Sequence, residues 1–387
     1  MKILTIQAAY FPMIGGAEVF HQKTAEYLVA KEHQVDVITC LWKKPDVFWR
    51  NWRKKEEILN GVNIHRVKPW FYRQYLKSIG AIWPLYKKAL QLIKVNKYDL
   101  IHAHIFPSSV IGALIKKKTN LPLIITVQGG DVADYSETGR DWSWLLEPFI
   151  SWSLRQADIV HVVSNYMEEI VKKLGVKRVK MIPNGVDSSL YKPRDKKKLK
   201  RKYRISQNKF VIISHSRLTP KNGLDLLIKS INKFSDKHKI LLLLVGGGEQ
   251  EKSLKQLVKK LKLEKQVRFL GYQSKEKTAE LLSMADLFVR PSRNEGFGIA
   301  FLEAMASGLA VIGTNQGGIK ELIKPGREGL LISVREREAL TLAIDNLRKN
   351  NELRKKMGQQ GRRKVIKSYS WNTITNDLEE IYKQVKL

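Results

Sequence analysis

Short runs of apolar residues alternate with helical stretches along the whole chain. In the first half these runs read KILTIQ, QVDVITC, VNIHRV, DLIHAH, PLIITVQ, DIVHVV and VKMIP. Several of them contain few polar residues, which is typical of strands covered by helices on both faces of a sheet. Helices are expected between many of the runs, the first from about residue 17 to residue 31. The pattern predicts a doubly wound α/β domain.

The alternation pauses after Pro183 and resumes beyond a strongly basic segment, residues 192–204. The later strand-like runs read FVIISHS, KILLLLVGGG, QVRFLGY, DLFVRPS, AVIGT and GLLIS. A final stretch, Trp371 to Val385, has its apolar residues at helical spacing. We therefore predict two α/β domains, residues 1–188 and 189–368, followed by a C-terminal helix over 369–387.

The segment from Pro291 to Ile323 carries the most specific pattern, PSRNEGFGIAFLEAMASGLAVIGTNQGGIKELI. A predicted strand ends near Arg290, a turn rich in glycine follows, and a helix begins near Gly298. Such a turn lets a ligand approach the backbone, and the helix start offers free N–H groups to a diphosphate. Glu295 and Glu303 flank this helix start and are acceptors for the hydroxyl groups of a sugar nucleotide.

This string resembles the E-x7-E signature of the retaining glycosyltransferases of family 4, which have the GT-B fold: two Rossmann-like domains with a central cleft. The resemblance runs nearly end to end. It implies that Glu303 holds the donor ribose and that Glu295 holds the transferred sugar. It also implies that the last helix crosses back to the N-terminal domain. The donor-binding residues that it indicates in this segment are Glu295, Gly296, Phe297, Gly298, Ile299 and Glu303, and Thr314 to Gly318 with Glu321 match the next family element.

A second motif, SRLTPKNG, places Arg217 at the predicted end of a strand and before a helix start near Gly223, where a cation neutralises phosphate. The family pattern is R-L-x-x-x-K-G, whose arginine and lysine bind the diphosphate. Here Asn222 occupies the lysine position and Lys221 precedes it, so we expect Lys221 to reach the phosphates instead. The predicted catalytic residues are therefore Arg217, Lys221 and Glu295.

Glycine-rich turns elsewhere complete the predicted donor site. Gly15 and Gly16 follow the first strand, and by resemblance Gly16 lies under the donor phosphates while Gly15 lies near the acceptor. The run LLLLVGGGEQ places Gly246 and Gly247 at another strand-to-helix turn, as in the family's turn near the nucleotide base.

The expected acceptor or sugar contacts are in the first domain. The run TVQGGDVAD has Gln128 where the family often has a histidine, and its Asp131 matches the family's acidic position. His102 and His104 point the same way from a strand, so a metal pair is conceivable, but no further ligands are evident nearby and we expect hydrogen bonding instead. The chain has no Asp-x-Asp, and we expect neither a metal nor a cofactor. The full contact set is Gly15, His104, Gln128, Asp131 and Asn184.

The charge is strongly basic, with 70 Lys and Arg against 37 Asp and Glu, a net charge of +33. Anionic partners are therefore expected, although a solvated lysine-rich surface explains part of the excess. Residues 42–88 mix tryptophans and tyrosines with basic side chains, a texture typical of a membrane interface but also of a carbohydrate site, a single-stranded nucleic acid site or a local aromatic core. The basic run 192–204 is either a second lipid contact or a solvated helix.

The single cysteine, Cys40, excludes an internal disulfide, and the N-terminus lacks the apolar segment of a signal peptide. We expect a cytoplasmic protein, either free or peripheral on the cytoplasmic face of the membrane. The predicted function is retaining transfer of a sugar from a UDP- or GDP-sugar to a glycan or lipid-linked acceptor. The alternatives are a nucleotide-sugar epimerase, which leaves the E-x7-E string unexplained, and a non-catalytic protein that binds sugar nucleotides or nucleic acid.

Overall fold

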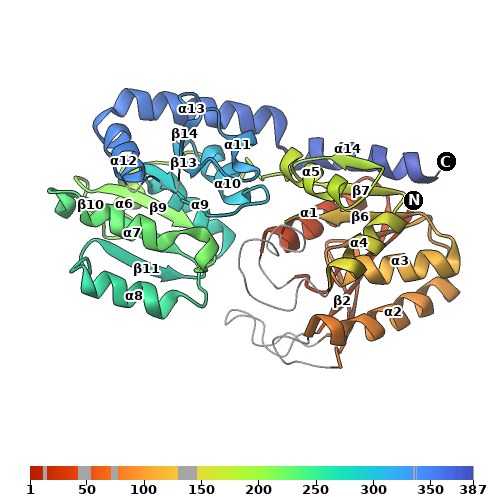
Figure 1. Cartoon of the computed structure of the whole chain (residues 1–387). Helices are drawn as coiled ribbons and strands as arrows, with labels where there is room; N and C mark the ends of the chain where they lie inside the picture. The colour runs from red at the N-terminus through yellow and green to blue at the C-terminus, as the bar shows by residue number, and fades with distance from the viewer. Residues whose placement is uncertain are drawn as a thin grey trace. The chain divides into compact units, whose positions relative to one another are not determined.

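The computed structural model describes residues 1–11, 15–41, 54–70, 77–129, 146–333, 336 and 338–386. The chain divides into two compact units, each with its own sheet (Figure 1). Unit 1 consists of Met1–Asn184 and Trp371–Leu387, and unit 2 consists of Gly185–Ser370.

The described part of unit 1 contains an eight-stranded sheet in the order β3-β4-β2-β1-β5-β6-β7-β8. All neighbours are parallel except β3 and β4, which form an antiparallel pair at one edge. The strands are β1 (Lys2–Ile6), β2 (Gln34–Cys40), β3 (Glu56–Leu59), β4 (Val62–Val67), β5 (Leu100–His104), β6 (Leu123–Val127), β7 (Ile159–Val162) and β8 (Val179–Met181).

Helices cover both faces of this sheet, so its central strands are buried (Figure 1). On one face, α1 and α14 pack against each other over a core that includes Phe20, Leu378 and Tyr382. On the other face, α3 lies so close to β5 that a Cβ at Gly112 would come within 3.0 Å of the Ala103 side chain. The helices are α1 (Gly16–Ala30), α2 (Lys77–Val95), α3 (Ser108–Thr119), α4 (Glu147–Gln156), α5 (Asn165–Lys173) and α14 (Trp371–Lys386).

The described part of unit 2 contains a six-stranded sheet, parallel throughout, in the order β11-β10-β9-β12-β13-β14. Its middle strands are almost entirely apolar and buried, and this explains why the sequence shows continuous rather than alternating hydrophobic runs. The strands are β9 (Phe210–His215), β10 (Ile240–Val245), β11 (Val267–Gly271), β12 (Leu287–Val289), β13 (Val311–Thr314) and β14 (Gly329–Ile332).

Helices also cover both faces of the second sheet. One face is covered by α7, α8 and α12, whose apolar residues join those of β9, β10 and β12 in one core. α9 packs against β9, α10 packs against β13, and α10 also contacts α13. The helices are α6 (Lys196–Lys202), α7 (Leu224–Asn232), α8 (Glu251–Lys260), α9 (Lys275–Met284), α10 (Ile299–Ala306), α11 (Ile319–Leu322), α12 (Ala339–Lys349) and α13 (Asn351–Ser368). Both units are doubly wound, as predicted.

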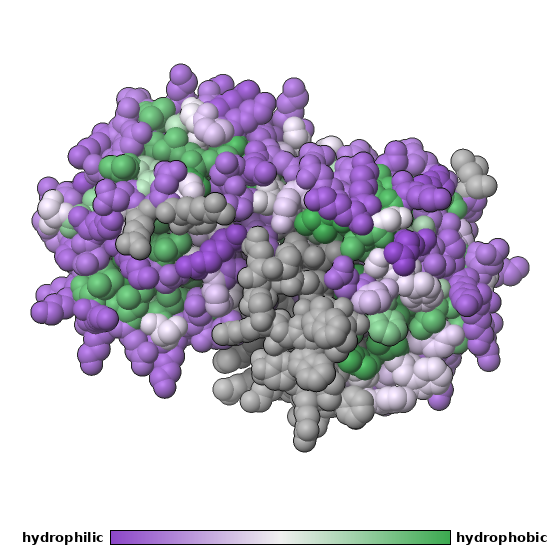
Figure 2. All heavy atoms as spheres, in the orientation of Figure 1, coloured by the Kyte–Doolittle hydropathy of each residue, from purple (hydrophilic) through white to green (hydrophobic). Residues whose placement is uncertain are grey.

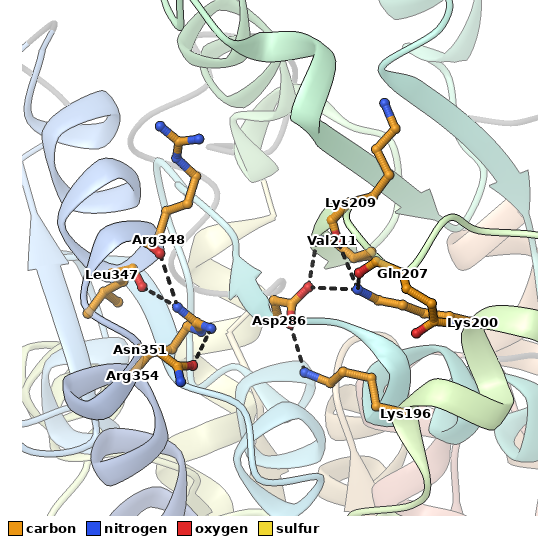
Figure 3. A network of polar contacts seen from close by, with 10 residues as sticks. All are labelled: Lys196, Lys200, Gln207, Lys209, Val211, Asp286, Leu347, Arg348, Asn351 and Arg354. Atoms are coloured by element: carbon orange, nitrogen blue, oxygen red, sulfur yellow. Dashed lines mark hydrogen bonds and ion pairs between the residues drawn. The ribbon is translucent and has the colours of Figure 1, made fainter.

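The basic run 192–204 forms a largely exposed helix, α6, as one of the two expectations has it, but Leu199 and Lys200 on its inner side are buried. Figure 3 shows the contacts of this inner side. The Asp286 carboxylate, just before β12, accepts hydrogen bonds from the Val211 N–H at 2.8 Å and from Lys196 Nζ at 2.9 Å. Lys200, only 5% exposed, lies 3.6 Å from the same carboxylate and donates to the Lys209 carbonyl at 2.7 Å. Asp286 therefore fastens α6 to the amino end of the sheet.

Replacing Asp286 with alanine is expected to lower the free energy of unfolding by about 3 kcal/mol, because Lys200 would stay buried without its counter-charge. Urea unfolding of the two proteins measures the difference. Asp345→Ala is the matched control, since Asp345 makes only partly exposed ion pairs with Arg348 and Lys349, and it should cost less than about 1 kcal/mol. Equal losses in both variants would contradict the assigned role.

Hydrophilic residues cover most of the visible surface of the described chain (Figure 2). Among the described residues, no helix combines the length and the apolar character needed to span a bilayer.

Candidate functional site

The strand order of unit 2 creates a point where the direction of winding reverses. From β9 the chain proceeds outward through β10 and β11, and it then returns to the other side of β9 with β12, β13 and β14. In open α/β sheets, ligands bind at the carboxyl ends of the strands flanking such a point. The predicted donor residues of unit 2 lie in the loops after β9, β10 and β12, or in the helix that follows.

Glycines allow the loops after β9 and β10 to lie against each other. A Cβ at Gly246 would lie 2.0 Å from the Ser216 carbonyl oxygen, and one at Gly248 would come within 2.6 Å of the Leu218 backbone. The Leu218 N–H donates to the Gly247 carbonyl at 2.9 Å. The predicted residues Gly246 and Gly247 therefore hold the Arg217 loop in place.

A similar contact joins the loops after β12 and β13. A Cβ at Gly317 would lie 2.0 Å from the Glu295 carbonyl oxygen, and one at Gly318 would lie 2.3 Å from the Gly296 carbonyl oxygen. The Gly318 N–H donates to the Glu295 carbonyl at 3.0 Å. Gly317 and Gly318 of the TNQGG segment thus pack against the backbone of the loop that carries Glu295 and hold it in place.

Arg217 lies two residues beyond the end of β9, rather than at the strand end as expected, and its side chain is exposed. No described residue forms an ion pair or hydrogen bond with its guanidinium group. Asn222 is turned inward instead: it is 4% exposed and donates to the Arg217 carbonyl at 2.6 Å and to Thr219 Oγ1 at 3.2 Å. Asn222 therefore fixes the loop, and the adjacent Lys221, half-buried, is the next cation along the chain.

Glu295 forms an ion pair with Arg290, a residue that the sequence reasoning did not select. The Arg290 side chain is only 7% exposed, and its guanidinium carbon lies 4.9 Å from the centre of the Phe301 ring. Burial against the ring holds this cation in one position. Arg290 directly precedes Pro291, the first residue of the recognised motif, so the sequence places it at the strand end. The sequence does not show that its side chain turns toward Glu295.

Glu303, in the second turn of α10, lies between two further side chains. The His215 ring nitrogen Nδ1 lies 3.1 Å from its carboxylate, and the Tyr191 hydroxyl also donates to it. Burial, followed by the charge of Glu303, raises the pKa of Tyr191 well above its usual value. His215 ends β9 beside the recognised arginine motif, whereas Tyr191 has no local sequence signal.

The start of α10 supplies backbone donors. Gly298 caps the helix in a left-handed conformation, with φ of 100°, which strongly favours glycine. Ile299 is the first helical residue, and the amide groups of a first helical turn have no acceptor within the helix. Phe297, 4% exposed, packs toward Tyr369 with ring centres 6.1 Å apart. The Phe301 N–H donates to the Gly298 carbonyl at 2.9 Å, so the turn is anchored at Phe297 and leaves the Ile299 and Ala300 amides for a ligand.

In unit 1, four residues carry buried polar side-chain atoms at the carboxyl ends of the strands. They are Gln7 after β1, His104 ending β5, Gln128 after β6 and Asn184 beyond β8, and none of these atoms has a hydrogen-bond partner in the described structure. An unpaired buried polar atom is costly, so such a group marks a place for a hydroxyl-rich ligand or for water. Gly15 and Gly16, at the start of α1, follow β1 at the same edge, and Asp131 lies outside the described residues.

The histidine pair is part of a larger cluster than the sequence indicated. The His104 ring stacks on His21 from α1 and contacts His102, with ring centres 4.0 Å apart in each case. His161 from β7 joins through Thr126, which lies 2.6 Å from His102 Nε2 and 2.9 Å from His161 Nδ1. His102 does form hydrogen bonds, as expected, whereas neither ring nitrogen of His104 is paired among the described residues.

Metal binding is not indicated by this cluster. Nowhere in the described chain do three His, Cys, Asp or Glu side chains converge in an arrangement that would hold a metal ion. Burial lowers the pKa of all four clustered histidines, so they are neutral near pH 7.

Two family models match consecutive parts of the chain. The model described as Glycosyltransferase Family 4 matches residues 14–190, and the model described as Glycosyl transferases group 1 matches residues 195–364.

Full-length relatives carry related descriptions. An uncharacterised glycosyltransferase of Methanocaldococcus jannaschii is 28% identical over 99% of this chain and 98% of its own length. The N-acetyl-alpha-D-glucosaminyl L-malate synthase of Bacillus anthracis is 29% identical over 99% of this chain and 97% of its own length.

Solved structures show the same fold. Sucrose-phosphate synthase from Thermosynechococcus elongatus superposes with a TM-score of 0.87 at 23% identity, covering 99% of this chain and 98% of that chain. Anabaena HepE in complex with UDP-glucose superposes with a TM-score of 0.81 at 23% identity, covering 99% of this chain and all of that chain. The prediction of a GT-B fold is confirmed.

Proposed function

This chain is a glycosyltransferase and belongs to family 4, and from that premise we propose that it transfers a hexosyl group from a nucleoside-diphosphate sugar to a glycan or lipid-linked acceptor, with retention of anomeric configuration. The observation that carries the proposal is the set of residues at the carboxyl ends of the strands in the unit 2 sheet. There the exposed Arg217, which has no partner among the described residues, lies in the loop after β9. A Cβ at Gly223 in this loop would lie 2.0 Å from the Pro291 carbonyl oxygen in the loop that carries Glu295, and Glu303 follows in α10. A cation for phosphate next to carboxylates for hydroxyls suits a sugar nucleotide. Anabaena HepE, which has the same fold, has been solved with UDP-glucose.

In the proposed reaction, the bond between the sugar C1 and the diphosphate oxygen breaks, and a bond from C1 to an acceptor oxygen forms. Negative charge grows on the leaving diphosphate while the sugar becomes oxocarbenium-like. Arg217, Lys221 and the first-turn amides of α10 would stabilise that charge as preorganised donors. The acceptor hydroxyl gives its proton to a leaving phosphate oxygen, so the step needs no protein base.

Glu295 and Glu303 take different roles in this proposal. The ion pair with Arg290 orients the Glu295 carboxylate, so that it can accept hydrogen bonds from the transferred sugar. Glu303, held by His215 and Tyr191, is positioned to accept from the ribose hydroxyls. Unit 1 would supply Gln7, His104, Gln128 and Asn184 to the hydroxyls of the sugar or the acceptor.

A lipid-linked acceptor is favoured by the described part of residues 42–88. Trp70 and Trp83 are 62% and 47% exposed, with ring centres 6.5 Å apart, and Tyr86 lies 5.7 Å from Trp83. Exposed tryptophans, one of them on the same helix as the exposed Lys87, suit the headgroup region of an anionic membrane. A relative from Mycobacterium tuberculosis, 28% identical over 63% of this chain, is named a GDP-mannose-dependent phosphatidylinositol monomannoside mannosyltransferase.

Release of nucleoside diphosphate from a panel of UDP-, GDP- and ADP-sugars tests the proposal. One donor should give clear turnover, and Glu303→Gln should lower kcat/KM for that donor by about 10- to 100-fold, because a charged acceptor of the ribose is lost. Glu352→Gln, an exposed carboxylate on α13, is the matched control and should leave the rate unchanged. NMR of the product's anomeric proton reports retention or inversion.

Three outcomes would contradict the proposal. Binding of a sugar nucleotide without turnover on any acceptor would indicate a non-catalytic binder. Conversion of one donor into its epimer without release of nucleoside diphosphate would indicate an epimerase. Absence of both binding and turnover in folded protein would remove the sugar-nucleotide assignment altogether.

A further inference from the structure

Unit 2 contains a cavity of about 390 Å³ whose lining is dominated by cations. It lies between the loop that connects α11 to β14 and the C-terminal half of α13. Its charged lining residues are Lys324, Arg327, Glu328, Arg363, Lys364 and Lys367. Five positive groups and one negative group leave a net charge of +4 around one cavity.

A single buried carboxylate organises these cations. Glu328, 1% exposed, accepts a hydrogen bond from the Lys324 N–H at 2.8 Å. Its other oxygen lies 3.5 Å from Arg327 Nε and 4.0 Å from Lys364 Nζ. Lys364 also donates to the Leu322 carbonyl at 2.6 Å. Glu328 and Lys364 therefore form a packed and hydrogen-bonded floor, and the exposed side chains of Lys324, Arg327, Arg363 and Lys367 surround it.

The remaining cations lack partners. Within the described structure, the side chains of Lys324, Arg363 and Lys367 form no ion pair and no hydrogen bond. The pKa of Lys364 is lowered, first by burial, and the positive charges of Lys324 and Arg327 also oppose its protonation. One carboxylate balances only part of this repulsion. A bound polyanion would balance the rest.

We propose that this cavity binds a ligand carrying two or more phosphate groups. Two guanidinium groups offer the paired donors that suit phosphate oxygens, and the lysines add charge without directional demands. The cavity volume lies within the range of about 300–1,000 Å³ typical of small-molecule sites, so it can hold more than one phosphate group.

This site differs from the proposed donor site in position and residues. The loop Lys324–Glu328 leads into the amino end of β14, whereas the donor loops follow the carboxyl ends of β9, β10 and β12. No lining residue of the cavity belongs to the donor motifs. The inference therefore holds independently of which sugar the enzyme transfers.

Calorimetric titration with inorganic pyrophosphate at physiological salt tests the inference. The native protein should bind two pyrophosphates, one in the donor site and one in the cavity. The double variant Arg363→Ala/Lys367→Ala should retain one site, and affinity at the other should fall at least about tenfold through the loss of two phosphate contacts. The control Lys259→Ala/Arg268→Ala removes the same charges from exposed positions of the same unit and should retain both sites.

Each result separates this inference from the proposed function. An unchanged stoichiometry and affinity in Arg363→Ala/Lys367→Ala, or an equal loss in the control, overturns the cavity site. Arg217→Ala should remove only the donor site, and failure of that variant to change binding counts against the donor assignment alone. Flotation with phosphatidylcholine vesicles, with and without cardiolipin, whose headgroup carries two phosphates, identifies the source. Capture that depends on Arg363 and Lys367 assigns the phosphates to a lipid headgroup, whereas pyrophosphate binding without capture assigns them to a soluble ligand.

Discussion

Replacing Arg217 with alanine is expected to lower kcat for sugar transfer by about 10²- to 10³-fold, the effect of removing one preorganised donor from a developing negative charge. The guanidinium is exposed, has no partner in the described structure, and lies at the point where the winding of the unit 2 sheet reverses. Since it holds no other part of the fold through its side chain, the loss should fall on the reaction and leave stability unchanged. Steady-state kinetics with saturating donor measures it.

The matched control for this prediction is Arg268→Ala. Arg268 is an exposed arginine on β11 in the same unit. Its replacement removes the same charge from the edge strand of the sheet, which β10 and β9 separate from β12. It should leave kcat unchanged. If Arg217→Ala raised only KM, the guanidinium would bind substrate and transition state equally, and its assigned catalytic role would be wrong.

Lowering the pH from about 7 to about 5 is expected to destabilise unit 1, because its buried histidines form a directed chain of hydrogen bonds. The Ile182 carbonyl can only accept, so His161 Nε2 donates to it, at 2.8 Å. His161 Nδ1 then accepts from the Thr126 hydroxyl, and Thr126 in turn accepts from His102 Nε2. His102 Nδ1 is left to accept from the Tyr382 hydroxyl of α14, at 2.7 Å. Every member must stay neutral.

The sign of the pH effect follows from the lowered pKa values. Burial lowers the pKa of His161 to about 4 and lowers the pKa of His21, His102 and His104 well below 6.5. The unfolded chain therefore takes up more protons than the folded chain below pH 6.5. The stability is complete above that pH and is lost as the pH falls from about 6.5 toward about 4, by about 1.4 kcal/mol per pH unit for each such histidine.

Urea unfolding at several pH values between about 7 and about 5 measures this loss, in a range where most carboxylates remain ionised. His238→Gln, at an exposed position in unit 2, is the control and should leave the pH dependence unchanged. Tyr382→Phe should reduce stability by about 1 kcal/mol at pH 7, because His102 Nδ1 loses its donor. A midpoint that does not move between the two ends of the pH range would contradict the assignment of neutral histidines.

Many residues of the candidate donor site could be predicted from short segments of the sequence. The turns at Gly246 and Gly298 follow apolar runs, so their place at strand ends was visible without any long-range information. The partners of the motif residues were not visible in this way. Arg290 lies within the recognised segment, but only packing on Phe301 directs it to Glu295. Tyr191 reaches Glu303 from a distant part of the chain, and no period or motif in the sequence links the two.

Asn222 shows where a family pattern misleads when it is applied position by position. The pattern places a phosphate-binding cation there, but the asparagine side chain is buried and bonds to the Arg217 carbonyl. A short amide at this position stabilises the loop that presents Arg217. Whether the neighbouring Lys221 takes the cation's role is tested by the same kinetic comparison with Lys221→Ala.

The sequence by itself determined the class of this protein. Apolar runs separated by helices specify two doubly wound sheets, because each run must be buried on both faces, and the glycine and glutamate motifs at the run ends specify the family. Only the tertiary structure decided which side chains meet: the four histidines of unit 1, the Arg290–Glu295 pair and the cations around Glu328. The physical reason is that local patterns depend on near neighbours, whereas these clusters join separate segments through strand order and burial.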